Sequence, residues 1–298
     1  MLGNILITGA SGWLGKSSIS YLLHRGCSLS QLLLVASEDK FFNVGNLHNV
    51  KAENYSKFET TRKIDGLIHL AFLTREKSAV MGLTRYSSIN QEITQTAVKI
   101  IRQTEPNWVV TVSSGAIFNP STKHLETNVA TNPYGFLKLQ EEEELTFATK
   151  TVGANLVIGR LWGASGSLMP INRSYALSDF IVQAVTDKKI EINAAHEVYR
   201  RYVDAEIFMA VLLERAISGK SESIDSGGST VEIGDLAKIV ADQLNIKNIN
   251  RPRLLNAEID DYYPRGDQFA TIAAELNLPI SEIREQVANT IEGHLSLL

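Results

Sequence analysis

Apolar runs alternate with amphipathic segments through the first half of the chain. The runs expected as strands are continuously apolar, which is typical of parallel strands that are buried on both faces. They cover residues 4–10, 31–37, 64–72, 107–114 and 155–162. Segments with a helical period lie between them, at 13–26, 83–103 and 135–150. Strands separated by helices predict right-handed crossovers and an α/β fold with a doubly wound, Rossmann-like parallel sheet.

The pattern changes after Trp162. Residues 163–174 are loop-like, 222–244 predict a strand, a turn and a capped helix, and two short helices are expected around Pro279. Residues 38–63 are polar and weakly periodic, and no element is predicted there. We therefore expect a Rossmann domain at 1–162 and a smaller C-terminal portion at 163–298. The strand near 222–228 is expected to return to the main sheet.

Composition limits the class of protein. The 298 residues are 44% hydrophobic and 21% charged, as in an ordinary globular enzyme. The net charge of −4 argues against a nucleic-acid binder that depends on phosphate contacts. With a single cysteine, Cys27, the chain has neither an internal disulfide nor a cysteine-based zinc site. We find no apolar run of ~18–20 residues. Because a strand-like apolar segment begins at residue 4, we expect no leader peptide and a soluble cytoplasmic protein without membrane partner or metal.

A glycine-rich turn follows the first strand. In ITGASGWLG, glycines stand at positions 9, 12 and 15, directly after a strand and at the start of a helix. This context suits a dinucleotide, because glycines permit a tight turn and close approach of the pyrophosphate, and the helix N-terminus attracts its charge. An ordinary glycine-rich turn is the alternative. The place at the first strand of an alternating chain favours dinucleotide binding, by Gly9, Ser11, Gly12, Trp13, Leu14 and Gly15.

The end of the second strand gives a mixed signal on the cofactor. An acidic residue there binds the ribose 2′-hydroxyl of NAD, whereas a basic residue accommodates the 2′-phosphate of NADP. Ala36 aligns with the usual acid and Ser37 follows it, while two acids and Lys40 come next. The choice between NAD and NADP stays open.

Two further motifs are weak when each is taken alone. Ser113 and Ser114 end a strand where α/β sheets bind ligands, but serines often end strands. Tyr134 and Lys138 lie four residues apart in NPYGFLKLQEEEE and share a helix face, as an ordinary surface pair would. The four glutamates at 141–144 are expected to form a solvated face.

Together and in this order, the motifs resemble the extended branch of the short-chain dehydrogenase/reductase superfamily, the NAD-dependent epimerase/dehydratase family that modifies nucleotide sugars. The resemblance rests on the GxxGxxG turn, on Ser-Ser before Ile-Phe, and on Pro-Tyr-x-x-x-Lys. Other segments that resemble the family are DGLIHLA at 65–71, Asn90, LVIGRLWGASG at 156–166, RRYV at 200–203 and SIDSGGSTVEIGDLA at 223–237. Residues 38–63 and 163–175 match it least.

The resemblance implies a catalytic set of Ser114, Tyr134 and Lys138. A free tyrosine has a pKa near ~10, and a neighbouring ammonium favours the phenolate, so Lys138 makes Tyr134 a usable acid and base. Ser114 would bind the same substrate oxygen. Further cofactor contacts are implied for Leu70, Ala71, Asn90, Tyr134 and Lys138, of which Lys138 would hold the nicotinamide ribose, besides the turn, Ala36 and Ser37. Substrate contacts are implied for Ser113, Ser114, Gly163, Arg200 and Arg201.

Departures from family patterns narrow the reaction. Gly115 and Ala116 stand where 4,6-dehydratases and nucleotide-sugar decarboxylases carry an acid, so loss of water or of carbon dioxide is not expected. Cys27 is far in sequence from the place where 3,5-epimerase/reductases need a cysteine. The remaining reaction is NAD(P)-dependent oxidoreduction at C4 of a nucleotide-diphosphate sugar, by a 4-epimerase or a 4-keto reductase. Glycine at 163 in place of the family's asparagine suggests room for a bulkier or deoxygenated sugar.

Two other classes remain open at this point. One is a reductase of a non-sugar ketone, and the other is a non-catalytic NAD(P)-binding regulator, although the latter often lacks the tyrosine or the lysine. The resemblance also implies a homodimer formed by the helices that carry Asn90 and Tyr134. The sequence names neither the nucleotide, the sugar nor the biological pathway.

Overall fold

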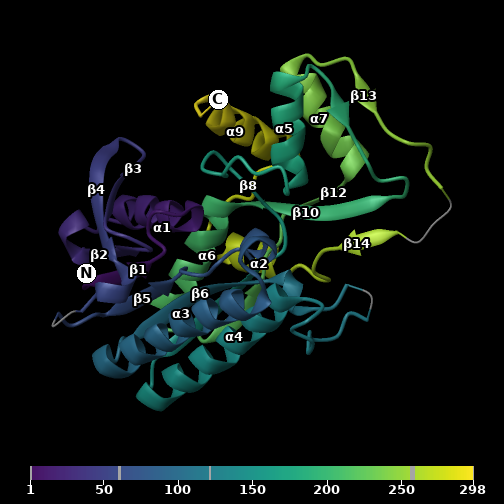
Figure 1. The fold of residues 1–298 in the computed structure, drawn as a ribbon. Helices are drawn as coiled ribbons and strands as arrows, with labels where there is room; N and C mark the ends of the chain where they lie inside the picture. Colours follow the sequence, from purple (N-terminus) through teal and green to yellow (C-terminus); the bar gives the residue numbers. More distant parts are fainter. Residues whose placement is uncertain (1, 60–61, 121, 256–258, 298) are drawn as a thin grey trace. The chain divides into compact units, whose positions relative to one another are not determined.

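The computed structural model describes residues 2–59, 62–120, 122–255 and 259–297, which form two compact units (Figure 1). The first unit comprises Met1–Leu161 and Met209–Ile224, and the second comprises Trp162–Phe208 and Asp225–Leu298. Both are of mixed α/β structure, and the first carries the doubly wound sheet that the sequence predicts.

An eight-stranded sheet forms the centre of the first unit. The strands β2, β1, β5, β6 and β7 are parallel neighbours, and β4 runs parallel to β2. Because β1 has β2 on one side and β5 on the other, the strand order reverses here, where open α/β sheets bind ligands. In spatial order the strands are β11 (Glu222–Asp225), β7 (Asn155–Leu161), β6 (Trp108–Ser114), β5 (Gly66–His69), β1 (Ile5–Thr8), β2 (Leu32–Ala36), β4 (Leu47–Asn54) and β3 (Lys40–Val44).

Helices cover both faces of this sheet. On one face α3 (Leu83–Thr104) and α4 (Pro133–Val152) lie side by side, and their apolar residues form one core with side chains of β1, β2, β5, β6 and β7. On the other face α1 (Trp13–His24) and α6 (Ala205–Ile217) are joined by hydrogen bonds from Tyr21 and Arg25 to Glu214 (Figure 1). The short elements are α2 (Arg75–Met81), η1 (Leu29–Gln31), η2 (Tyr55–Lys57) and η3 (Gly115–Ile117).

The antiparallel hairpin β3–β4 lies within residues 38–63, for which the sequence predicts no element. It extends the main sheet, because β4 pairs with β2 through Ala36 and Asn54. Only Val44, Val50 and Ala52 of the hairpin are buried, whereas Phe41 is exposed. A short edge hairpin with so few inward apolar residues has little of the alternation that marks a strand in sequence.

The second unit contains two small sheets and four helices among the described residues. The longer sheet has the order β12 (Ser229–Glu232), β10 (Val198–Asp204) and β14 (Asp260–Tyr262), and β8 (Ala164–Ser165) pairs with β10. The shorter sheet joins β9 (Ile190–Glu191) to β13 (Ile249–Asn250). The helices are α5 (Ala176–Thr186), α7 (Ile233–Leu244), α8 (Gln268–Glu275) and α9 (Ile283–Leu295).

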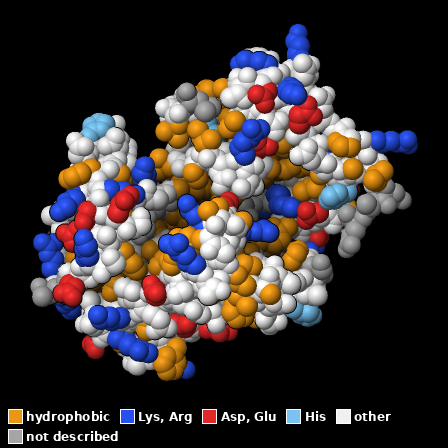
Figure 2. All heavy atoms as spheres, viewed as in Figure 1, with side chains coloured by type: hydrophobic (Ala, Val, Ile, Leu, Met, Phe, Trp, Pro, Cys, Tyr) orange, Lys and Arg blue, Asp and Glu red, His pale blue; other side chains and the backbone are white. Residues whose placement is uncertain are grey.

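Charges of both signs are intermixed on the face drawn in Figure 2. Among the described residues, no helix combines the length and apolar composition needed to cross a membrane. No group of three or more His, Cys, Asp or Glu side chains in the same residues is arranged to hold a metal ion.

Candidate active site

The glycine-rich turn links β1 to α1 with very close backbone packing. Gly9 has φ +69°, and a Cβ on it would lie 2.8 Å from the Leu70 carbonyl group. A Cβ on Gly15 would overlap the Gly9 carbonyl oxygen, so the first turn of α1 lies directly on the loop. The helix begins without a side-chain cap and without an acidic residue in its first turn. Its free N–H groups therefore suit a phosphate.

The segment that follows β5 is held beside this turn. The Leu70 and Ala71 N–H groups donate to the Thr8 hydroxyl at 3.2 and 3.3 Å. Further along, Leu73 N–H donates to Asn90 Oδ1 at 2.8 Å. Asn90 thus fixes the chain that follows β5, and its side chain also faces the Tyr86 hydroxyl. This network holds the segment beside the glycine-rich turn.

The end of β2 gives no clear choice of cofactor. Ala36 is buried and pairs with Asn54 in the sheet. Asp39 accepts a hydrogen bond from the Asn54 N–H at 2.9 Å, and Glu38 lies 3.4 Å from Lys40. Both acids after the strand are therefore already engaged, with a backbone amide and with a lysine.

Tyr134 is brought to the end of β6 by a contact between α4 and η3. The Asn132 side chain caps α4 by accepting from the Gly135 N–H at 3.0 Å, and it donates to the Ala116 carbonyl at 2.9 Å. Gly135 lies so close to that carbonyl that a Cβ would overlap it. The Ala116 N–H in turn donates to Ser114 Oγ at 3.1 Å. The start of α4 is therefore attached to the turn that follows Ser114.

Lys138 lies one turn further along α4 and is 4% exposed. Its Nζ donates to the Val112 carbonyl at 2.9 Å and to Glu141 Oε2 at 2.7 Å, and it lies 3.8 Å from the centre of the Phe72 ring. The Phe72 ring meets Tyr134 edge to face, with centroids 5.9 Å apart. The phenol and the ammonium thus share Phe72 as a neighbour.

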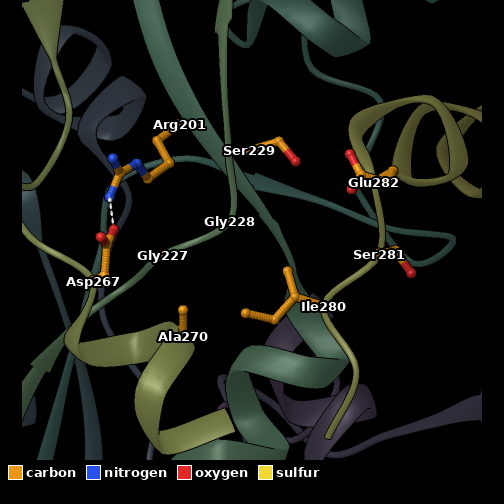
Figure 3. Close-up of a pocket in the computed structure, with 9 residues that line it drawn as sticks. All are labelled: Arg201, Gly227, Gly228, Ser229, Asp267, Ala270, Ile280, Ser281 and Glu282. Carbon is orange, nitrogen blue, oxygen red and sulfur yellow. Dashed lines mark ion pairs between the residues drawn. The ribbon is translucent and has the colours of Figure 1, made fainter. Parts of the chain in front are cut away.

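In the second unit, Arg200 and Arg201 point to different partners. Arg200 forms a bidentate ion pair with Asp260 at 3.0 and 2.7 Å. Arg201 donates to Thr230 and to the Gly266 carbonyl, both at 2.9 Å, and lies 3.8 Å from Asp267. It lines a pocket of about 230 Å³, together with the loop Gly227–Ser229 and the segment Ile280–Glu282 (Figure 3).

Gly163 has a packing role in the same unit. A Cβ at this position would lie 2.5 Å from the Arg201 carbonyl oxygen, and the Gly163 carbonyl accepts from the Val203 N–H at 3.2 Å. The expectation that this glycine leaves room for a larger sugar is therefore wrong. The space beside its Cα is filled by the backbone of β10.

Comparison with known proteins identifies the family. The model of the NAD dependent epimerase/dehydratase family matches residues 5–219. The chain belongs to this family. The family that the sequence motifs resembled is thereby confirmed.

Two curated proteins match the chain. A UDP-2-acetamido-2,6-beta-L-arabino-hexul-4-ose reductase of Pseudomonas aeruginosa is 24% identical over 237 residues, 78% of this chain and 56% of the relative. A UDP-glucose 4-epimerase of Halalkalibacterium halodurans is 24% identical over 176 residues, 55% of this chain and 51% of the relative. The chain thus spans little more than half the length of the curated relatives that it matches.

A solved structure has a similar fold. It is the UDP-N-acetylglucosamine 4-epimerase of Methanobrevibacter ruminantium in complex with UDP-N-acetylmuramic acid. The TM-score is 0.79 with 19% identity, and the match covers 100% of both chains. At this identity the likeness establishes the fold alone.

Two of the four glutamates at 141–144, which are expected to face water, are buried. Glu141 is 1% and Glu142 is 5% exposed, so the expectation of a solvated face is wrong for both. Glu142 accepts both arms of the Arg160 guanidinium at 3.1 and 2.7 Å. A sequence signal existed for Glu141, because residues 134, 138 and 141 fall on one helical stripe.

Proposed function

We propose that the protein catalyses NAD(P)-dependent oxidoreduction at C4 of a nucleotide-diphosphate sugar, as a 4-epimerase or a 4-keto-sugar reductase. The attachment of the Tyr134 end of α4 to the turn after Ser114 carries this proposal, since it brings the acid/base candidate to the carboxyl end of β6. The two curated relatives are a 4-epimerase and a reductase of a 4-keto sugar, which supports C4.

The residues of the first unit fit a dinucleotide. The uncapped start of α1 would receive the pyrophosphate, and the turn from Gly9 to Gly15 would let the backbone approach it. Asn90, Leu70 and Ala71 would border the nicotinamide end, and Ala36 with Ser37 the adenosine end. When bound, the nicotinamide supplies hydride transfer at the substrate carbon.

Side chains of the first unit would transfer the proton of the substrate oxygen. Tyr134 would give or take the proton of the C4 oxygen, and Ser114 would hydrogen-bond the same oxygen and orient it. Lys138 would favour the phenolate by its positive charge. Ser113, whose hydroxyl is buried without a partner among the described residues, would border the sugar.

The second unit would bind the nucleotide diphosphate. Arg201 borders a pocket that Asp267 and Glu282 also line, and its guanidinium could grip a phosphate that displaces Asp267 from it. Arg200 would join only by exchanging Asp260 for the ligand, and Gly163 would act through the position of the Arg201 backbone. We thus assign dinucleotide binding to 1–162 and substrate binding mainly to 163–298.

A homodimer in the cytoplasm completes the proposal. Phe147 of α4 is 66% exposed beside Gln95 and Arg102 of α3, in a shallow depression of about 270 Å³. An exposed aromatic residue between charged side chains suits a helix-to-helix contact with a second copy. Sedimentation at micromolar concentration checks this, and a monomer would contradict it.

The purified protein and its cofactor test the function. We would identify any retained nucleotide after denaturation and then assay UDP-hexoses and 4-keto nucleotide sugars with NADH and NADPH. Retained oxidised cofactor with interconversion of C4 epimers identifies an epimerase, and consumption of added reduced cofactor identifies a reductase. Reduction of a non-sugar ketone without any turnover of nucleotide sugars would overturn the proposal.

A further inference from the structure

The carboxylate of Glu141 is buried in the first unit beside Lys138. Its Oε2 accepts from Lys138 Nζ at 2.7 Å, and its Oε1 lies 3.2 Å from His69 Nε2. Although burial alone would raise the pKa of Glu141, the Lys138 ammonium and His69 outweigh it and hold the pKa below its ordinary value. The carboxylate is therefore an anion inside the protein, and such an anion is retained only with good partners.

Polar contacts link Thr8 to Glu141 through His69. The Thr8 hydroxyl oxygen accepts from the Leu70 and Ala71 N–H groups, and it lies 2.8 Å from His69 Nδ1. The other ring nitrogen, Nε2, lies 3.2 Å from Glu141 Oε1, a close contact that does not have the geometry of a hydrogen bond. A chain of polar contacts thus runs from the last residue of β1 to Lys138.

The surroundings of Lys138 leave its ammonium little freedom. Two donors are directed to the Val112 carbonyl and to Glu141, and the Phe72 ring covers another side of the ammonium at 3.8 Å. Glu141 is the only carboxylate among the described residues that is within ion-pair distance of this ammonium. Glu141 therefore both orients the ammonium of Lys138 and lies beside it as a counterion.

We propose that Glu141 is a positioning residue that holds Lys138 protonated and turned toward Val112 and Phe72, and that His69 and Thr8 anchor it to the dinucleotide turn. This inference rests on the proposed function, in which the Lys138 charge favours the Tyr134 phenolate. Glu141 touches neither cofactor nor substrate in this scheme and acts through the lysine.

The titratable groups that face Glu141 are few. Lys138 and Glu144 come from α4 itself, His69 from β5 and Tyr55 from η2. Burial and the Glu141 charge raise the pKa of Tyr55, which donates its hydroxyl hydrogen to the Ile93 carbonyl and stays neutral. Lys138 is thus the cationic side chain paired with Glu141 in this cluster.

Substitution Glu141→Gln tests the proposal through the pH profile of kcat. Removing the anion leaves a buried ammonium without a counterion, so the ammonium releases its proton at a lower pH. We expect the alkaline limb of kcat to move down by at least about one pH unit. At the pH optimum of the wild type we expect kcat to fall at least about tenfold, while the cofactor Kd changes less than about threefold.

Glu142→Gln is the matched control, because it removes a buried carboxylate from the same helix that pairs with Arg160 instead. It is expected to keep the wild-type pH profile. A wild-type profile in Glu141→Gln would overturn the inference, as would the same shift in both variants. Tyr134→Phe is assayed beside them. Retained turnover of the nucleotide sugar in Tyr134→Phe refutes the acid/base role of Tyr134 in the proposed function, whereas its loss together with an unshifted Glu141→Gln refutes only the role of Glu141.

If Glu141→Gln does not fold, Glu141→Asp tests the positioning role of Glu141 instead. Aspartate keeps the anion but shortens its reach by one methylene group, so the proposal predicts a lower kcat with the alkaline limb near that of the wild type. A kcat equal to the wild type would show that the position of the carboxylate is immaterial and would overturn the proposal.

Discussion

The Asn132 side-chain amide donates to the Ala116 carbonyl at 2.9 Å, while its oxygen caps α4 at Gly135. One side chain thus both starts the helix and fastens it to the turn after Ser114. Because Tyr134 lies between Asn132 and Gly135, its position depends on these two hydrogen bonds.

Two variants of Asn132 separate these roles. Asn132→Asp keeps an N-cap acceptor but has no hydrogen to donate to Ala116, whereas Asn132→Ala loses both. We expect kcat to fall in both variants, and the unfolding free energy to fall further in the alanine variant, by about 1 kcal/mol for the lost cap. Urea unfolding and initial rates check this. A wild-type kcat in Asn132→Asp would show that the tether to Ala116 has no role.

The turn before α1 should not accept a side chain at position 15. In Gly15→Ala the methyl group would overlap the Gly9 carbonyl oxygen, so the loop has to move away from the helix start. We expect cofactor affinity to fall at least about tenfold, because the backbone then misplaces its phosphate donors. Ser20→Ala, further along the same helix, is the control. Isothermal titration with NAD and NADP measures both, and equal affinities in the two variants would contradict the assignment.

Acid should remove the stabilisation that Glu141 provides. Its pKa lies below the ordinary value in the folded protein, so the stabilisation is present above the unfolded pKa of about 4.5. It is lost as the pH falls through the folded value. Glu141→Gln should therefore lower the unfolding free energy at pH 7 by on the order of 3 kcal/mol, with a smaller difference below pH 4. A difference independent of pH, from denaturant unfolding at both pH values, would contradict this.

Substitutions of the two arginines of β10 should have different effects. Arg201 borders the pocket, so Arg201→Lys should raise the substrate KM with little change in kcat, since lysine loses the forked grip on a phosphate. Arg200→Lys should instead lower stability by about 1 kcal/mol, because its bidentate partner Asp260 is partly exposed. Steady-state kinetics and thermal unfolding of both variants check this. A larger KM effect in Arg200→Lys would reverse the assignment.

Sequence patterns were sufficient for the central sheet and for its covering helices. Parallel strands such as Ile5–Thr8 and Trp108–Ser114 are rich in apolar residues because both faces are covered, and that composition is visible without a structure. Helix α6 lacked such a signal, since Phe208 to Leu213 are all buried and leave no polar face to reveal a period. The hairpin β3–β4 lacked one for the opposite reason, because most of its side chains face water.

The motifs located the candidate site but not the contacts within it. The spacing of Tyr134 and Lys138 predicted one helix face, and both residues do contact Phe72. The burial of Glu141 depends on His69, 72 residues earlier in the chain, which only the folded sheet brings beside α4. The role of Gly163 likewise depends on the backbone of a strand that lies far along the chain.

The proposed enzyme depends above all on Tyr134, which transfers the proton in nucleotide-sugar oxidoreduction. The decisive measurement compares Tyr134→Phe with the wild type in kcat for the nucleotide sugar and in Kd for the cofactor. We predict that kcat falls by about 10²–10⁴-fold, while the Kd stays within about twofold because the phenol oxygen alone is removed. Turnover equal to the wild type in Tyr134→Phe, with the cofactor bound, would contradict this role of Tyr134.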